Sequence, residues 1–524
     1  MSPSDAFREW IRVLRERFDL GERRVWAGAL AALFLLGAGS RAGLWFELGW
    51  HPALRQEERT HGVSSHWFRT ARLAAAGDWA LEGAQPEVTP AMARLAPGPF
   101  WAELWRSRLP RGAPAVYLLS ASFVWDRSAT PYRWAAVAAG GAMAVLAALL
   151  AASFFGRGAG LLAGVLLAAN GPLATASLRV GPWAWEALAA LLALWLWRRA
   201  RSRPDEPAEW LMLGAAAAFG VLLRPMFWWA PTLLALDVLL TKSRRPALGA
   251  LLCAALPLVA AGGALTVRNA RAGAPALPVV GSPALDLARA WNADSVAGPR
   301  WPSERLLLEA AGGSAARYAS LAAGSAELRR SSPRVAHALA HHVAGARDEP
   351  ADLSYDYVRR RSGWLRATTL SSDLSMVLLW TSLLALLLRS RLPAGLGAAV
   401  GVLALHGFLF TPFGEDRAPL HALACVLGAG AFAGAWERRH AAPGGPWLLL
   451  AGAWTVFALL RVDDHSRGPR LRYDDFARSA AVLSREGRRD AARFERADWA
   501  ARVGYEEPFD LTARERWDVI EWNG

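Results

Sequence analysis

The stretch VWAGALAALFLLGAGSRAGLW, residues 25–45, decides the fold class of this chain. It is apolar over a length that matches the roughly 20 residues a helix needs to cross the hydrocarbon core of a bilayer. Similar runs recur almost to the end of the 524-residue chain, of which 54% is hydrophobic. We therefore expect an all-α polytopic membrane protein, in which one transmembrane domain carries extramembrane insertions.

Twelve apolar segments are candidate spans, and one of them does not fit as a full crossing. The segment 113–126 is too short for a straight crossing, and Asn170, Gly171 and Pro172 interrupt another candidate. The sequence alone leaves open which of the two is the partial span. The candidates are residues 25–45, 113–126, 133–155, 158–177, 182–198, 209–223, 225–241, 246–267, 373–389, 393–411, 417–436 and 446–460.

Arginine clusters set the expected orientation. Four basic clusters lie two spans apart in succession, and the positive-inside rule makes their common side cytoplasmic. They are RRARSR (198–203), KSRR (242–245), RSR (389–391) and ERR (437–439). The N-terminal arginines favour the same side, so about eleven crossings place the C-terminus outside.

This orientation gives the expected domain layout. Residues 1–24 form a cytoplasmic amphipathic segment, and residues 25–460 form the transmembrane domain. The loops 41–112 and 268–372 and a small tail, 461–524, lie outside. Chemistry on the outer side is therefore expected.

Composition excludes several classes of function. The net charge of +14 comes from short basic clusters between spans, which topology explains, so no nucleic-acid partner is expected. The two cysteines, Cys253 and Cys425, lie in apolar segments and offer no disulfide framework or zinc site. His337, His341 and His342 have helical spacing but no accompanying carboxylate or cysteine, and a solvated helix face is the better interpretation. No metal-ligating residues and no cofactor are expected, and the sequence leaves metal dependence open.

The stretch QEERTHGVSSHWFRTARLAAAGDW, residues 56–79, follows the first span and carries two adjacent carboxylates. Glu57 and Glu58 would meet the membrane interface, where a general base can reach both a lipid-borne and a water-borne substrate. The alternative is structural, because acidic residues at a helix N-terminus interact favourably with the helix dipole by about 0.3–1 kcal/mol. Spacing alone leaves both interpretations open.

This stretch resembles the first outer loop of the family 39 glycosyltransferases. In that loop an acidic pair, a tyrosine, an alanine-containing helix and Gly-Asp-Trp follow one another. Here Glu57 stands where the family usually has Asp, His61 stands for the tyrosine, and Asp78 lies in the Gly-Asp-Trp motif. The family belongs to the GT-C group, which includes protein O-mannosyltransferases and the lipid A aminoarabinose transferase.

Four further stretches resemble family motifs in the same order. LPRGAPAVYLLSASFVWDRSATPYR (109–133) is similar to the proline-rich segment before the second span, and Arg224-Pro225 resembles an outer Arg-Pro pair. Arg268 and Asn269 end a span and are followed by Gly273 and WNADSVAG, which together resemble the family's Asn-rich outer loop. GEDRAPLHALA (414–424), which contains Arg417 and His421, resembles the Arg-Tyr-x-x-Pro stretch that opens a late span.

The resemblance implies a GT-C-type helical bundle and an inverting glycosyltransferase on the outer, periplasmic side of a bacterial inner membrane. It makes Glu57 or Glu58 the catalytic base. A polyprenyl-phosphate sugar is the implied donor, and a glycan, lipid or protein is the acceptor. Arginines suit such a donor, because they bind phosphate through charge-assisted hydrogen bonds. The donor-phosphate candidates are Arg224, Arg268 and Arg417, and the other substrate-binding candidates are His61, Asp78, Asn269 and His421.

Two other functions fit parts of the sequence. A transporter or flippase of lipid-linked substrates would use Glu186 and Asp237, carboxylates within apolar runs, because ionisable residues in membranes are usually functional. Such proteins often contain inverted repeats, and the sequence shows none. An inactive scaffold with the GT-C fold is the second alternative, because Glu57 replaces the family's aspartate. Each arginine could also lie at a span end only to reach the lipid headgroups.

Overall fold

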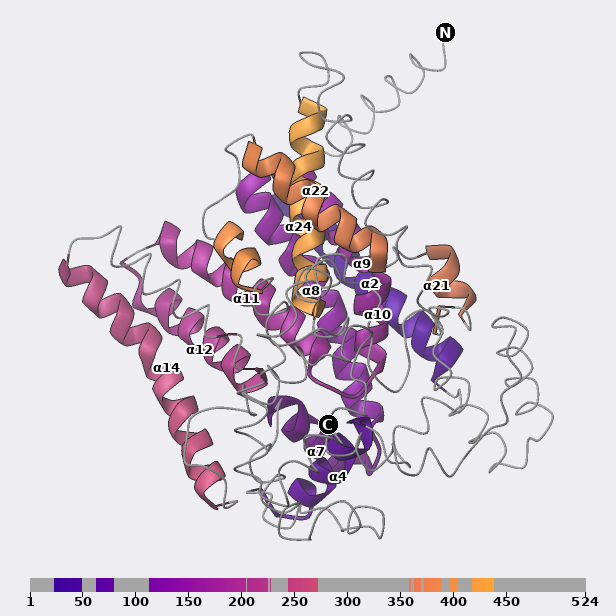
Figure 1. Cartoon of the computed structure of the whole chain (residues 1–524), viewed down its shortest axis with the longest axis vertical. Helices are drawn as coiled ribbons and strands as arrows, with labels where there is room; N and C mark the ends of the chain where they lie inside the picture. Colours follow the sequence, from indigo (N-terminus) through magenta and orange to yellow (C-terminus); the bar gives the residue numbers. More distant parts are fainter. Residues whose placement is uncertain are drawn as a thin grey trace, which may run out of the picture.

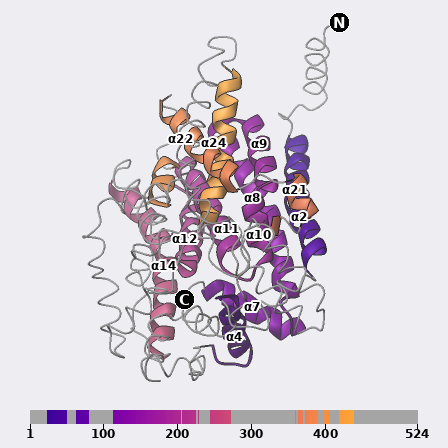
Figure 2. The same ribbon diagram turned by 45° about the vertical axis from the view of Figure 1, so that its right-hand side comes forward.

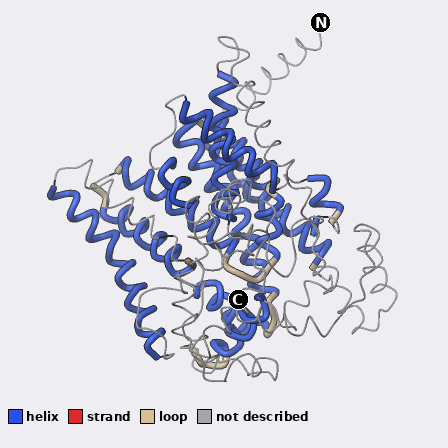
Figure 3. Tube along the Cα trace, viewed as in Figure 1, coloured by secondary structure: helices blue, strands red, loops and turns tan. Residues whose placement is uncertain are grey.

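The computed structural model describes residues 23–49, 63–79, 113–203, 205–224, 227, 244–271, 358–359, 362–368, 372–388, 396–403 and 417–437. The regular elements within these segments are helices (Figure 3). Glu57, Glu58 and His61 lie outside the described residues, as do almost all of the predicted span 225–241 and the whole of 446–460.

The described helices are α2 (Arg23–Leu48), α4 (Val63–Ala75), α7 (Ala113–Asp126), α8 (Thr130–Phe155), α9 (Arg157–Ala168), α10 (Gly171–Leu178), α11 (Trp183–Ser202), α12 (Pro207–Leu223), α14 (Arg244–Arg271), α21 (Gly363–Thr368), α22 (Ser372–Leu388) and α24 (Ala418–Glu437) (Figure 1). Most of them begin and end within four residues of a predicted span. Helices α9 and α10 divide the candidate 158–177, and α4 and α21 lie in the predicted outer loops 41–112 and 268–372.

Three helices of the described part are long and apolar enough to cross a membrane. They are Arg23–Leu48, Thr130–Phe155 and Gly249–Arg271, and α9, α12 and parts of α22 and α24 are shorter apolar helices. The chain is therefore a multi-pass membrane protein. The count of eleven crossings stays a prediction.

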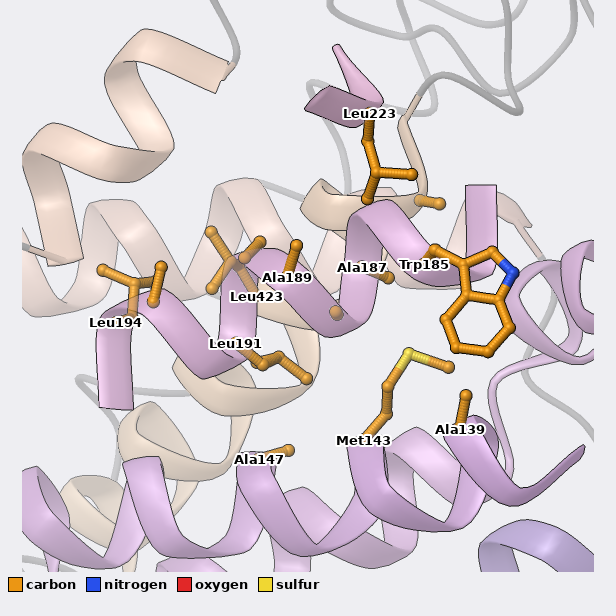
Figure 4. Close-up of a cluster of buried hydrophobic side chains, with 14 of the residues drawn as sticks. Ala139, Met143, Ala147, Trp185, Ala187, Ala189, Leu191, Leu194, Leu223 and Leu423 are labelled. Atoms are coloured by element: carbon orange, nitrogen blue, oxygen red, sulfur yellow. The ribbon is translucent and has the colours of Figure 1, made fainter. Parts of the chain in front are cut away.

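The core lies between α8, α11, α12 and α24, and small side chains dominate it. Ala139 and Ala147 of α8 and Ala187 and Ala189 of α11 are almost fully buried there (Figure 4). Small residues let helix backbones approach closely, which replaces the hydrophobic driving force that lipid does not supply. Met143 of α8 packs beside the Trp185 ring of α11 (Figure 4).

A close helix contact joins α2 to α8. A Cβ atom on Gly37 of α2 would lie 2.9 Å from the carbonyl oxygen of Gly140 and 3.2 Å from the Cα of Gly141. No larger side chain fits at this position without moving a backbone. The two helices therefore pack through their glycines.

Arg41 of α2 is fully buried at the same contact, and a Cβ atom on Gly140 would overlap its side chain. Its Nη1 donates to the Gly37 carbonyl at 2.9 Å, and its Nη2 lies 3.5 Å from the Leu167 carbonyl. Helix α9 ends at Ala168, so the charge of Arg41 meets the negative end of the α9 dipole. The arginine thus fixes the end of α9 against α2.

The interruption predicted at Asn170 separates α9 from α10. Asn170 is fully buried, and its Oδ1 accepts a hydrogen bond from the Leu173 amide at 3.1 Å, which caps α10. Its Nδ2 donates to Ser375 Oγ at 2.8 Å, so the break is also tied to α22.

Helices α4 and α7 lie side by side at one end of the bundle (Figures 1 and 2). The Phe68 and Phe123 rings are 6.0 Å apart, and the Arg72 guanidinium lies 5.4 Å from the centre of the Phe123 ring. The 14 residues of α7 extend about 21 Å, which is short of the roughly 30 Å of a hydrocarbon core. Helix α7 is therefore too short for a straight crossing, and so is the 12-residue α9 in the interrupted candidate.

The glycine contact predicts a matched pair of stability effects on α2. Gly37→Leu should lower the midpoint of thermal unfolding in detergent, because overpacking costs about 1–3 kcal/mol. Gly39→Leu is the control, since a Cβ atom at Gly39 meets nothing within 4 Å and the change in helix propensity is the same. Equal midpoints for the two variants would contradict the close α2–α8 contact.

Candidate functional site

The last turn of α14 holds an arginine with unused hydrogen-bonding capacity. Arg268 is only 8% exposed, and its Nη2 donates to Asn269 Oδ1 at 2.9 Å. Its Nε and Nη1 are buried and make no hydrogen bond within the described residues. Buried N–H groups of a charged side chain are costly when they have no acceptor. Arg268 can therefore offer two donors and a positive charge to an anion.

The turn that ends α4 is set by local backbone hydrogen bonds. The Asp78 amide donates to the Leu73 carbonyl at 3.0 Å, and the Gly77 amide donates to the Ala74 carbonyl at 3.1 Å. Gly77 has a φ of +101°, so the turn is a Schellman motif, which requires this left-handed conformation and favours glycine. The Gly of the Gly-Asp-Trp motif thus ends the helix, and Asp78 and Trp79 follow it in fixed positions.

Tyr117 of α7 joins this turn to Arg268. Its hydroxyl donates to the Trp79 carbonyl at 2.8 Å, and the two rings stack with centroids 5.7 Å apart and an interplanar angle of 30°. The same side chain lies beside the Arg268 guanidinium and interacts with it electrostatically. Elements far apart in the sequence therefore converge, and we call Asp78, Trp79, Tyr117, Arg268 and Asn269 the α4–α7–α14 corner.

Arg224, another donor-phosphate candidate, has a carboxylate partner. Its Nε lies 2.6 Å from Glu186 Oε1, and Glu186 is fully buried while Arg224 is 9% exposed. Glu186 lies in the first turn of α11, and Arg224 directly follows α12. The pair joins the ends of these two helices.

Arg417 and His421, the candidates on the late helix, are both buried at the start of α24. They lie one turn apart, and the imidazole Nδ1 of His421 makes no hydrogen bond within the described part of the chain. The Sγ of Cys425 donates to the His421 carbonyl at 3.4 Å and lies 3.7 Å from Asn170 Nδ2. This end of α24 therefore packs beside the break between α9 and α10.

The structure thus brings Asp78, Arg268 and Asn269 into one corner and pairs Arg224 with Glu186. The corner also contains Tyr117 and Trp79, to which the sequence motifs gave no role. Tyr117 stands in the proline-rich stretch and Trp79 ends the Gly-Asp-Trp motif, so the resemblance was the signal that could have identified them. Within the described residues, no group of three or more His, Cys, Asp or Glu side chains is arranged to hold a metal ion.

No protein-family model matches this chain, and no curated protein matches its sequence. The comparison with solved structures finds the oligosaccharyltransferase AglB from Archaeoglobus fulgidus. The apo form has a TM-score of 0.39 and 13% identity, over 92% of this chain and 61% of that one. The complex with an inhibitory peptide and a dolichol-phosphate has a TM-score of 0.40 and 14% identity, over 92% and 56%. The form tethered with an acceptor peptide has a TM-score of 0.41 and 13% identity, over 89% and 56%.

The chain thus spans less than two thirds of the length of these structures. The likeness concerns the course of the helices alone. Roles for individual residues rest on the geometry of this chain and on the family motifs.

The buried ion pair predicts a test of whether Arg224 is structural. Glu186→Leu and Arg224→Met should each lower the thermal midpoint in detergent strongly, because breaking a buried pair costs about 3–5 kcal/mol. The double variant Glu186→Leu/Arg224→Met should recover much of the loss, since it leaves no uncompensated charge. A double variant no more stable than either single one would show that the pair is not the reason for burying these residues.

Proposed function

We propose that this protein is an inverting GT-C-type glycosyltransferase that moves a sugar from a polyprenyl-phosphate donor to an acceptor on the outer side of the membrane. The observation that carries the proposal is the buried guanidinium of Arg268, whose Nε and Nη1 make no hydrogen bond within the described residues. Arg268 lies near the end of an apolar helix that can span a membrane. A phosphate at headgroup depth supplies the oxygens that these donors lack.

The proposed reaction is a single displacement. Glu57 or Glu58 takes the proton from the acceptor hydroxyl or amine, and the acceptor atom forms a bond to the anomeric carbon. The bond between that carbon and the phosphate oxygen breaks, and its electron pair leaves on the phosphate. The polyprenyl phosphate thereby gains a negative charge, which Arg268 and Arg417 stabilise together with Arg224.

The other substrate-binding candidates have distinct places in this proposal. Asp78 and Asn269 belong to the α4–α7–α14 corner, beside the proposed phosphate site. His421 shares the start of α24 with Arg417, and His61 lies between the two glutamates and α4 in the sequence. Acceptors consistent with this arrangement are a glycan, a lipid or a protein.

A transporter or flippase is the competing function. It needs Glu186 and Asp237 along a path, and Glu186 is paired with Arg224 at 2.6 Å. The pairing favours a structural role for this carboxylate over a place in a transport path. An inactive scaffold remains the other competitor, and turnover separates it from an enzyme.

The donor site gives the first test of the proposed function. Purified protein should consume a polyprenyl-phosphate sugar and leave nucleotide sugars unchanged. Arg268→Gln should weaken binding of polyprenyl phosphate about tenfold or more, since charged hydrogen bonds contribute about 1.5–3 kcal/mol. Arg271→Gln is the matched control, because Arg271 lies on the same helix one turn further on and is exposed.

The outcomes of this test are distinct. Turnover of a nucleotide sugar without any lipid carrier would overturn the proposed donor. Equal binding by the Arg268 and Arg271 variants would remove Arg268 from the site. Movement of an intact lipid-linked sugar across vesicles, without transfer to an acceptor, would favour the flippase.

The acidic pair gives the second test. Glu57→Gln and Glu58→Gln keep side-chain size but remove the base, so one of them should lower turnover by about 10²–10⁴-fold while donor binding is retained. A helix-capping role predicts nearly intact turnover, because one favourable dipole charge contributes less than about 1 kcal/mol. The assay is transfer to acceptor by purified protein, with the thermal midpoint as the folding control.

If both glutamine variants turn over at near wild-type rates, the base lies elsewhere. Asp78→Asn is then the next variant to measure, because Asp78 directly precedes the tryptophan that Tyr117 holds beside Arg268.

A further inference from the structure

We propose that Trp79, held in place by Tyr117, is the surface on which the sugar ring of the donor stacks. The inference rests on the proposed function, because the sugar is the one attached to the lipid phosphate. It deepens that function by assigning recognition of the sugar to a side chain separate from the one that binds the phosphate.

The backbone of Trp79 is fixed by hydrogen bonds, whereas its ring is accessible to solvent. Its amide donates to the Gly77 carbonyl at 3.0 Å, and its own carbonyl accepts from the Tyr117 hydroxyl at 2.8 Å. The side chain stacks on the Tyr117 ring and is nevertheless 56% exposed. The indole N–H makes no hydrogen bond within the described residues. An oriented, exposed aromatic ring is a surface prepared for a ligand.

The position of Trp79, one side chain away from Arg268, indicates which ligand its ring contacts. Tyr117 contacts Trp79 and also neighbours the Arg268 guanidinium, so one side chain separates the aromatic ring from the proposed phosphate site. In a polyprenyl-phosphate sugar, the ring is joined directly to a phosphate oxygen. A phosphate held by Arg268 therefore leaves the sugar within reach of the Trp79 and Tyr117 rings.

The chemistry of both groups agrees with this placement. One face of a pyranose or furanose ring carries C–H bonds, whose positive ends pack on the negative face of an aromatic ring. The hydroxyl groups at the ring edge can accept a hydrogen bond from the indole N–H. Aromatic walls with a few placed polar groups are typical of small-molecule sites.

Trp125 of α7 offers a control for the competing role of interfacial anchor. Trp residues are enriched at membrane interfaces, where they contact lipid headgroups without recognising a sugar. Trp125 is 84% exposed at the end of α7, beyond the segment that Tyr117 joins to the corner. An anchoring effect should appear at both tryptophans, whereas sugar stacking should appear only at Trp79.

The experiment measures binding of two kinds of probe to the purified full-length chain in lipid nanodiscs. One probe is polyprenyl phosphate, and the others are the same lipid phosphate carrying mannose, galactose or arabinose. Trp79→Ala should weaken the preferred sugar-bearing probe about three- to tenfold and leave the bare phosphate unchanged. Trp79→Phe should recover part of the loss, Trp125→Ala should change neither probe, and Arg268→Gln should weaken both.

The other outcomes separate failure of the stacking proposal from failure of the proposed function. An equal loss for both probes in Trp79→Ala makes the tryptophan an interfacial anchor and overturns the stacking proposal. If no sugar-bearing probe binds wild type more tightly than the bare phosphate, the stacking proposal fails while the phosphate site stands. If wild type binds neither probe, the proposed function itself fails. Trp79→Leu replaces Trp79→Ala in the same comparison if the alanine variant has a lowered thermal midpoint.

Discussion

A guanidinium buried in an apolar helix bundle is costly unless acceptors surround its N–H groups. Three buried arginines of this chain have three different surroundings. The terminal nitrogens of Arg41 donate to main-chain carbonyls, Nη1 to Gly37 of its own helix and Nη2 to Leu167 at the end of α9. Arg224 pairs with the Glu186 carboxylate. Arg268 has an amide oxygen and a tyrosine beside it, with two N–H groups left over within the described residues. The first two arrangements fix helices against each other, and the third leaves capacity for a ligand.

Local backbone chemistry then determines what surrounds Arg268. Because Gly77 adopts a left-handed conformation, α4 ends abruptly and its chain turns with Asp78 and Trp79 exposed to the corner. Tyr117 can bridge to this turn because α7 packs along α4 through Phe68 and Phe123. The short helix α7 thus places Tyr117 within reach of the turn that follows α4.

The sequence predicted the helices well because apolar runs and arginine clusters are local signals. The segments that became α11, α12, α22 and α24 begin and end within four residues of their predicted limits. The interruption at Asn170 was also readable, because Asn-Gly-Pro disfavours a continuous helix. The sequence could not tell whether α7 was the partial span. Its packing beside α4 at one end of the bundle now favours that choice.

The site was less predictable, because its contacts join residues distant in sequence. Nothing near Arg224 indicates that its partner is Glu186, and nothing near Arg268 indicates Tyr117. The family resemblance gave Arg224 and Arg268 the same role. Their neighbours differ in charge, which only the tertiary structure reveals. Glu57, Glu58 and His61 lie outside the described residues, so their roles stay predictions.

Glu186 beside Arg224 is charged, whereas Tyr117 and Asn269 beside Arg268 are neutral. This difference affects how a phosphate ligand binds and leaves. A carboxylate beside an arginine satisfies the arginine and competes with an incoming phosphate for the same N–H groups. A phenol and an amide orient the guanidinium without neutralising it, so its full charge faces the ligand. The developing charge on a departing lipid phosphate is stabilised best by a cation whose field no fixed anion cancels. Arg268 comes nearer to this condition than Arg224. The groups beside its guanidinium, Tyr117 and Asn269, are neutral, although the carboxylate of Asp78 belongs to the same corner. Arg224 meets the condition only if Glu186 is displaced or protonated.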